Sequence, residues 1–357
     1  MYDVILSFIT AFALTYVAIP SIINIALKKG LYDEPDHRKS HTTPIPNLGG
    51  IGIFAGVIFS IIIWTPFDVF GDLQYILGAF IIIFLIGAKD DIAPISPYKK
   101  LLGQIFASFI LVFKANIRLT SLYGIFGVTA IPEIPSIILS MFTILVIINA
   151  FNLIDGINGL SGSIAVLISV SLGTWFLLIE HIELAIVAFA LAGSVIAFLR
   201  YNITPARIFM GDTGALLIGL VCAILTIEFI ELHKEIRPSP YAFEAVPAVA
   251  IGILILPLFD TLRVFIMRLL KGQSPLHPDR THIHHLLIDC GLTHMQATGI
   301  LVVVNLFFIV LAVKFQGIGT LNLLLLILAV ATAMSMGLYF YAGYRKRLNS
   351  TTTPHVR

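Results

Sequence analysis

The sequence predicts an all-α integral membrane protein, a polytopic bundle of about eleven transmembrane helices. Of the 357 residues, 58% are hydrophobic and only 12% are charged, and the mean hydropathy is +0.98. A helix needs roughly 17 to 25 apolar residues to cross a hydrocarbon core about 30 Å thick, and runs of that length recur along the chain. The composition excludes a soluble domain. Unalternated runs such as 245–259 favour helices over barrel strands.

Eleven apolar runs follow one another, and each is predicted to form one membrane-spanning helix, because only helices and closed barrels satisfy their own backbone in lipid. No internal repeat or polar linker separates them, so residues 1–357 are predicted to be a single membrane domain. Within it, 268–296 is predicted to form a cytoplasmic loop that contains histidines. The runs lie near 4–27, 48–65, 73–89, 101–117, 134–153, 160–179, 183–200, 212–231, 245–267, 297–315 and 320–343.

The basic residues predict the orientation. The first run is too long for a signal-peptide core and ends in Lys28-Lys29, so it is predicted to be an uncleaved helix with its N-terminus outside. From that start, 17 of the 22 lysines and arginines fall on one side. The positive-inside rule makes this side cytoplasmic, and the C-terminus lies there too. The other five are Lys114, Arg118, Lys234, Arg237 and Lys314.

Four short polar clusters interrupt the apolar sequence, and this topology puts all of them on the cytoplasmic side. They are 89–91 (KDD), 152–158 (NLIDGIN), 202–212 (NITPARIFMGD) and 277–285 (HPDRTHIHH). An ion or lipid transporter usually carries its ionisable residues at mid-membrane, on broken helices. These clusters instead lie at predicted helix ends, where a soluble substrate could meet a lipid headgroup. They predict one metal-dependent active site, with a transporter or a passive scaffold as the alternatives.

The residue types in these clusters favour Mg²⁺. Adjacent carboxylates such as Asp90 and Asp91 repel one another, and an oxygen-ligated cation is a common reason to keep them together; a charged helix end in water is the alternative. Asp155 and Asp212 are flanked by glycine, which lets backbone approach a ligand, although a helix cap explains the same pattern. The four histidines in 277–285 suit zinc or phosphate, and the carboxylates favour phosphate.

In order along the chain, eight segments resemble the polyprenyl-phosphate N-acetylhexosamine-1-phosphate transferase family. They are 33–35 (DEP), 38–41 (RKSH), 44–50 (PIPNLGG), 90–91 (DD), 100–104 (KLLGQ), 152–156 (NLIDG), 209–214 (FMGDTG) and 282–285 (HIHH). The resemblance implies a bacterial inner-membrane enzyme with a cytoplasmic active site that uses Mg²⁺, with Mn²⁺ as a substitute. Such an enzyme transfers N-acetylhexosamine 1-phosphate from a UDP-sugar to undecaprenyl phosphate, releases UMP and starts cell-envelope polysaccharide synthesis. The implied partners are these two substrates and membrane lipid, with no nucleic acid; a homodimer is left open.

Two details refine the resemblance. The segment 280–285 (RTHIHH) resembles the branch that transfers GlcNAc 1-phosphate. The peptidoglycan branch instead ends its loop in three consecutive histidines, and Leu286 occupies the third place here. GlcNAc is therefore the predicted sugar. Asn158 stands where many relatives carry aspartate, which argues against a mechanism that makes a second carboxylate at that position essential, because asparagine can ligate or hydrogen-bond but cannot act as a base.

The resemblance also implies roles for individual residues. Asp212 is the leading Mg²⁺ ligand, and Asp91 is a second candidate ligand, although the sequence does not separate the roles of ligand and base between Asp90 and Asp91. The acceptor is a phosphate monoester with a second pKa of about 6, so catalysis needs charge neutralisation and alignment more than deprotonation. Direct transfer and a covalent aspartyl-phosphate both stay open. The catalytic candidates are Asp90, Asp91, Asp155 and Lys100, and the substrate-binding candidates are Asn152, Asn158, Asn202, Phe209, Arg280, His282, His284, His285, Lys39 and His41.

Some of these assignments have simpler alternatives. Phe209 is expected to stack on uracil, but it is one of 26 phenylalanines, and packing explains an aromatic side chain equally well. Lys39 and His41 lie in a loop whose positive charge the positive-inside rule already explains. Asp260 and Arg263, one helical turn apart, are predicted to form a structural i,i+3 pair.

Overall fold

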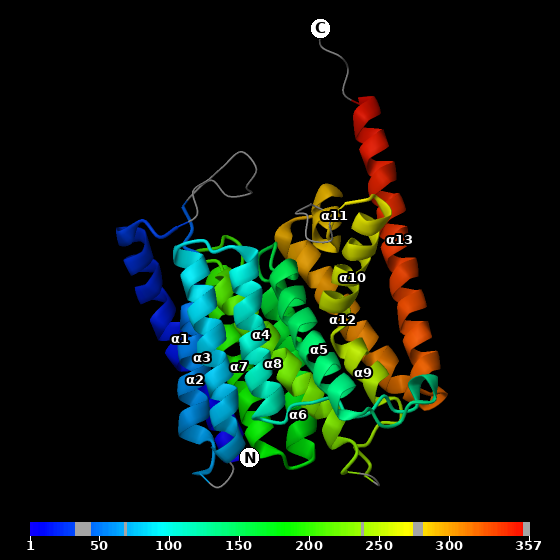
Figure 1. The fold of residues 1–357 in the computed structure, drawn as a ribbon. Helices are drawn as coiled ribbons and strands as arrows, with labels where there is room; N and C mark the ends of the chain where they lie inside the picture. The colour runs from blue at the N-terminus through cyan, green and yellow to red at the C-terminus, as the bar shows by residue number, and fades with distance from the viewer. Residues whose placement is uncertain (33–43, 68–69, 237–238, 274–280, 353–357) are drawn as a thin grey trace.

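The computed structural model describes residues 1–32, 44–67, 70–236, 239–273 and 281–352, and over these residues it is helical, with no β-strand (Figure 1). Each predicted run contains a helix. The helices are α1 (Tyr2–Lys29), α2 (Gly49–Trp64), α3 (Phe70–Ile92), α4 (Pro97–Phe113), α5 (Glu133–Ile154), α6 (Leu160–Leu178), α7 (Ile182–Asn202), α8 (Gly211–Leu232), α9 (Val246–Ile253), α10 (Ile255–Leu270), α11 (Ile283–Asp289), α12 (His294–Lys314) and α13 (Thr320–Thr352).

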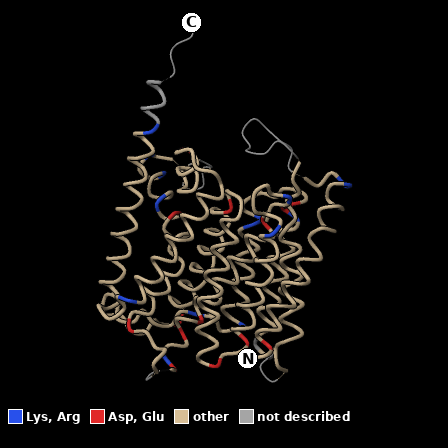
Figure 2. The backbone as a smooth tube through the Cα atoms, turned by 180° about the vertical axis from the view of Figure 1, so that it is seen from behind, with Lys and Arg blue, Asp and Glu red and all other residues tan. Residues whose placement is uncertain are grey.

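Seven of the described helices are long and apolar enough to cross a membrane, or eight if the bent pair α9 and α10 counts as one span. Figure 2 shows the charged residues towards the two ends of the bundle, with an uncharged band between them. This arrangement confirms the polytopic all-α class. The total of eleven spans and the orientation of the termini stay predictions.

Helix α8 forms the centre of the bundle. It packs against α2, α3, α5 and α6, and nearly all of its residues are buried. At the first turn of α8 the backbones of α2 and α8 are in direct contact, because a Cβ atom on Gly50 of α2 would overlap the backbone of Gly214. Two hydrogen bonds continue this contact before the helix starts: Gly49 N donates to Phe209 O at 2.9 Å and Phe209 N donates to Pro46 O at 2.8 Å. The motifs PIPNLGG and FMGD therefore pair, and they fix the start of α8.

The ninth predicted span is wrong in one respect. A continuous helix over 245–267 was expected, but the chain bends by 83° between α9 and α10. Pro257 has no N–H to donate to the carbonyl of Ile253, four residues earlier. The buried side chain of Asn305, from α12, replaces that donor: Nδ2 donates to Ile253 O at 3.0 Å, and Oδ1 accepts from Leu256 N at 3.2 Å. One side-chain amide from another helix therefore stabilises the break.

Replacing Asn305 by leucine should destabilise the protein. The change leaves two backbone groups at the break without their partner in an apolar interior, and each such group costs about 1–3 kcal/mol. Thermal unfolding in detergent should show a clearly lower midpoint. Asn322→Leu is the matched control, because its amide is exposed on α13, and exposed substitutions usually stay within about 0.5 kcal/mol. Equal midpoints for the two variants would contradict the role of Asn305.

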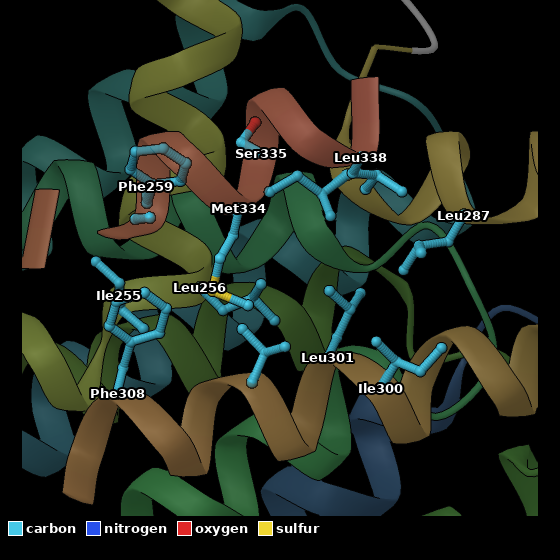
Figure 3. Close-up of a pocket in the computed structure, with 13 residues that line it drawn as sticks. Ile255, Leu256, Phe259, Leu287, Ile300, Leu301, Phe308, Met334, Ser335 and Leu338 are labelled. Atoms are coloured by element: carbon cyan, nitrogen blue, oxygen red, sulfur yellow. The ribbon is translucent and has the colours of Figure 1, made fainter. Parts of the chain in front are cut away.

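Beyond the break, α10 is apolar outside and charged inside. Leu262, Ile266 and Leu269 are exposed, whereas Asp260 and Arg268 are 1% and 4% exposed. An apolar cavity of about 170 Å³ lies between α10, α11, α12 and α13 (Figure 3), lined by side chains that include Leu256, Phe259, Leu287, Leu301, Phe308 and Leu338. The exposed face of α10 suits contact with lipid, and its charged residues face the protein.

Candidate active site

Side chains from α3, α4, α5 and α8 meet at one site. Lys100 Nζ, in the first turn of α4, lies 3.3 Å from Asp90 Oδ2 at the end of α3, and it also forms an ion pair with Asp212 Oδ2 in the first turn of α8. Asn152, in the last turn of α5, donates from Nδ2 to Asp212 Oδ1 at 2.6 Å. The ion-paired side chains are 14–26% exposed. A substrate can therefore reach a lysine held between two carboxylates.

Asp91 has a different environment from its neighbour. Its Oδ1 accepts from the backbone N–H of Asp212 at 2.7 Å, and its Oδ2 accepts from the N–H and hydroxyl of Thr213 at 2.9 and 2.5 Å. Met210, the residue before α8, provides no side-chain cap. A carboxylate at a helix N-terminus satisfies unpaired N–H groups and interacts favourably with the helix dipole. Asp91 thus caps α8 from α3 and holds the backbone that carries Asp212.

Gly211 makes this cap possible. It has φ +72°, a conformation that favours glycine, and a Cβ atom at this position would lie 2.6 Å from Asp91 Oδ2. The sequence left two explanations for the glycine before Asp212, close approach to a ligand or a helix cap. The structure shows that this glycine makes room for the cap. The structure also separates the two adjacent aspartates: Asp90 contacts Lys100, and Asp91 contacts α8.

Asp155 follows the last residue of α5 and is half-buried. Burial raises the pKa of its carboxyl group well above the usual range, and the nearby charges of Asp212 and Asp91 raise it further. Asp155 therefore belongs to the same electrostatic cluster as the other three aspartates. A cation in this cluster would relieve their repulsion.

The turn after Asp155 is held by residues from two other helices. Gly159 N donates to Asn202 Oδ1 at 2.7 Å, and Asn202 Nδ2 donates to Ile208 O at 2.9 Å. Asn202 thus joins the NLIDGIN turn to the segment before α8, with both ends of its buried amide bonded to backbone. Its contact with a nucleotide stays a prediction.

Asn158 also serves this turn. Its Nδ2 donates to Thr204 Oγ1 at 3.0 Å, and its carbonyl accepts from Thr298 Oγ1 of α12 at 3.0 Å. Its backbone N–H faces His294 Nδ1 at 3.5 Å. Neither Thr298 nor His294 was predicted, because a threonine or histidine in the first turns of an apolar helix is not a pattern that indicates a site.

His284, in the described part of the histidine segment (281–285), lies beside the same turn. The ring of His284 packs directly on Gly156, and its Nε2 has no hydrogen-bond partner among the described residues. Burial, and next the charge of His285, lower the pKa of His284 to about 3, so this imidazole is neutral. His282 is bonded to Asp260, with Nδ1 2.9 Å from Oδ2.

The predicted pair between Asp260 and Arg263 is confirmed, with Nη2 to Oδ1 at 2.9 Å. Phe209 is half-buried and its backbone is paired with the PIPNLGG segment. Three predicted site residues lie outside the described residues, and their roles stay predictions: Lys39, His41 and Arg280.

The donor set of the cluster fits Mg²⁺. Mg²⁺ prefers oxygen ligands, and it usually takes one or two protein carboxylates together with substrate phosphates and water. Asp90 and Asp212 offer carboxylate oxygens around one cation, the ammonium group of Lys100. The described residues contain no group of three or more His, Cys, Asp or Glu arranged to hold a metal by themselves.

Comparisons with known proteins match the resemblance seen in the motifs. The profile of glycosyl transferase family 4 covers residues 73–230, which include Asp90, Lys100, Asp155 and Asp212. A probable undecaprenyl-phosphate N-acetylglucosaminyl 1-phosphate transferase of Bacillus subtilis (strain 168) is 30% identical over 88% of this chain and 85% of its own. The undecaprenyl-phosphate alpha-N-acetylglucosaminyl 1-phosphate transferase of Pasteurella multocida (strain Pm70) is 33% identical over 82% and 81%, and that of Escherichia coli (strain K12) is 32% identical over 76% and 73%. With identity of this level extending over most of each protein, the chain belongs to glycosyl transferase family 4.

Proposed function

We propose that this protein transfers GlcNAc 1-phosphate from UDP-GlcNAc to undecaprenyl phosphate, forming the lipid diphosphate-sugar and UMP. The observation that carries the proposal is the lysine held between Asp90 and Asp212 at the end of the bundle. The relatives are named for the same transferred group, N-acetylglucosaminyl 1-phosphate, and the same acceptor, undecaprenyl phosphate. The site faces the cytoplasm of an eleven-span inner-membrane protein in this proposal, and undecaprenyl phosphate enters from the membrane. The cluster at helix ends gives a transporter no support.

The chemistry follows from charge. The acceptor phosphate has a second pKa of about 6, so at neutral pH it is already largely ionised, and the main barrier is the approach of one anion to another. Lys100 supplies a positive charge to the phosphate oxygens, and Asn152 fixes the orientation of the Asp212 carboxylate. Asp91 fixes the position of the Asp212 backbone. Alignment and charge neutralisation are the means by which phosphoryl transfer is generally catalysed.

We assign Mg²⁺ to Asp212 as the leading ligand. Asp90 is better placed than Asp91 to share the ion, because the oxygens of Asp91 already accept three hydrogen bonds from α8. When bound there, Mg²⁺ would neutralise diphosphate oxygens. The carboxyl group of Asp155, the fourth aspartate of the cluster, then lies beside the ion or the sugar. The remaining substrate contacts are proposed for Phe209 at the uracil ring and for Lys39, His41, Asn158, Asn202, Arg280, His282, His284 and His285.

A direct assay tests this function. Detergent-solubilised protein is incubated with undecaprenyl phosphate and a panel of UDP-N-acetylhexosamines, and UMP and the lipid product are measured. We expect UMP release with UDP-GlcNAc, its loss with excess chelator, and its return when Mg²⁺ or Mn²⁺ is added. No UMP from any donor, from protein that still shows a cooperative unfolding transition, would reject the proposal.

A further inference from the structure

Asp260 is a buried carboxylate that does not belong to the aspartate cluster. It lies in α10, one turn after the break, and is 1% exposed. Its Oδ1 accepts from Arg263 Nη2 at 2.9 Å and from the backbone N–H of Ile283 at 3.0 Å, and its Oδ2 accepts from His282 Nδ1 at 2.9 Å. A buried charge is costly unless it is paired and hydrogen-bonded. Here both carboxylate oxygens are hydrogen-bonded, and two of the three donors belong to residues 282 and 283.

Together, Asp260 and Arg263 hold three consecutive residues. Arg263 Nη2 donates to the carbonyl of Thr281, while Asp260 bonds the side chain of His282 and the N–H of Ile283. The entry into α11 is therefore fixed at its backbone and at its first histidine. A simple i,i+3 pair within α10 would need none of these contacts.

The hydrogen bond to Asp260 determines that Nδ1 of His282 carries a proton. An ionised carboxylate only accepts hydrogen bonds, so Nδ1 of His282 must carry the proton, and Nε2 is the ring nitrogen left for another partner. The ring of His282 stacks on His284 with centroids 5.7 Å apart and an interplanar angle of 11°. His284 packs on Gly156, beside Asp155. A contiguous set of contacts thus runs from α10 through two imidazoles to the NLIDGIN turn.

We propose that Asp260 is a positioning residue for phosphoryl transfer, which acts by holding His282 through Nδ1–H, so that Nε2 points away from Asp260 and, when it carries a proton, donates to a substrate phosphate oxygen. The inference rests on the proposed function and adds a residue that the sequence motifs did not assign to the reaction. Partners that orient a metal-ligating histidine typically contribute about 10–100-fold to metal affinity or activity, and we expect an effect of the same order for a histidine that binds phosphate. Asp260 acts through His282 and does not touch the reacting atoms.

Two substitutions of similar shape test this role. Asp260→Asn keeps an oxygen for Arg263 and Ile283 but places an NH₂ group opposite Nδ1 of His282, which reverses the proton arrangement. His282→Asn keeps an N–H donor that can reach Asp260, but it has no nitrogen at the position of Nε2. Each variant, and the double variant, is assayed for UMP release with UDP-GlcNAc and undecaprenyl phosphate, and for thermal unfolding.

We expect Asp260→Asn to lower kcat by about 10–100-fold, with a KM for UDP-GlcNAc within about threefold of wild type, since Asp260 acts on the reacting phosphate through His282 and does not contact the rest of the nucleotide-sugar. The double variant should be no less active than His282→Asn alone, because residues in one network are not additive. Thr261→Val is the control: this neighbouring hydroxyl is buried without a hydrogen-bond partner among the described residues, and its loss should leave kcat unchanged.

Three results would overturn the inference: full activity of Asp260→Asn, losses that multiply in the double variant, or a loss of kcat that is matched by a collapse of the unfolding transition. The activity of the wild-type protein distinguishes a failure of the inference about Asp260 from a failure of the proposed function. If wild type releases no UMP, the proposed function fails; if wild type is active and Asp260→Asn is equally active, only the role of Asp260 fails.

Discussion

Asp212→Asn should abolish UMP release while the protein stays folded. Asparagine keeps an oxygen for Asn152 but loses the negative charge that Lys100 and the proposed Mg²⁺ require. Loss of a group that stabilises transition-state charge costs about 10²–10³-fold in rate, and loss of a metal ligand should cost at least as much. The ion pair with Lys100 is partly exposed, so the free energy of unfolding should change by only about 1 kcal/mol or less.

The control for this prediction is Glu133→Gln. It removes one negative charge from an exposed carboxylate at the start of α5, where the partner is Arg118 at 3.5 Å. Activity should be unchanged, which shows that charge loss alone does not reduce turnover. Measurable turnover by Asp212→Asn at more than a tenth of the wild-type rate would remove Asp212 from the proposed metal site.

Asp91→Ala should reduce both stability and activity, and Asp91→Asn should reduce them less. Alanine leaves the N–H groups of Asp212 and Thr213 without their partner, and loss of a helix cap costs about 0.5–2 kcal/mol. Because the first turn of α8 carries Asp212, its displacement should also lower UMP release by about 100-fold, since small misplacements of a catalytic group cost that much. Asparagine keeps one acceptor oxygen and should be intermediate in both measurements.

The graded order distinguishes a cap from a metal ligand. A ligand role predicts that the alanine and asparagine variants are equally inactive, with unfolding midpoints like that of wild type. A cap predicts a lower midpoint for alanine than for asparagine, in parallel with UMP release. Thermal unfolding and the UMP assay on the same preparations decide between them.

Much of the fold could be predicted because membrane helices are specified by length and apolarity, which are local properties. The break after Ile253 could not, since Pro257 alone permits either a kinked or a continuous helix. The partner that stabilises the bend, Asn305, lies about fifty residues away in another apolar run. The family could be predicted because its motifs occur in order, and each contains residue types that an apolar helix rarely carries.

The site was predicted less completely, for a related reason. Residue type and position put Asp90 and Asp91 in one cluster, but only three-dimensional packing shows that one carboxylate contacts Lys100 and the other caps α8. Asn202 was predicted to bind substrate, and its amide is used by two backbone segments. Thr298 had no pattern to indicate it, because its hydroxyl acts on a turn 140 residues earlier.

Helix α12 has a consequence for the evolution and engineering of this protein. It lies outside residues 73–230, the segment that the family profile matches, yet its side chains hold both the break before α10 and the turn after Asp155. A hybrid that imports 73–230 from a relative into this chain must therefore also keep α12 compatible with the imported turn. Residues 73–230 are therefore not structurally independent, because a helix outside the matched segment stabilises one of their turns.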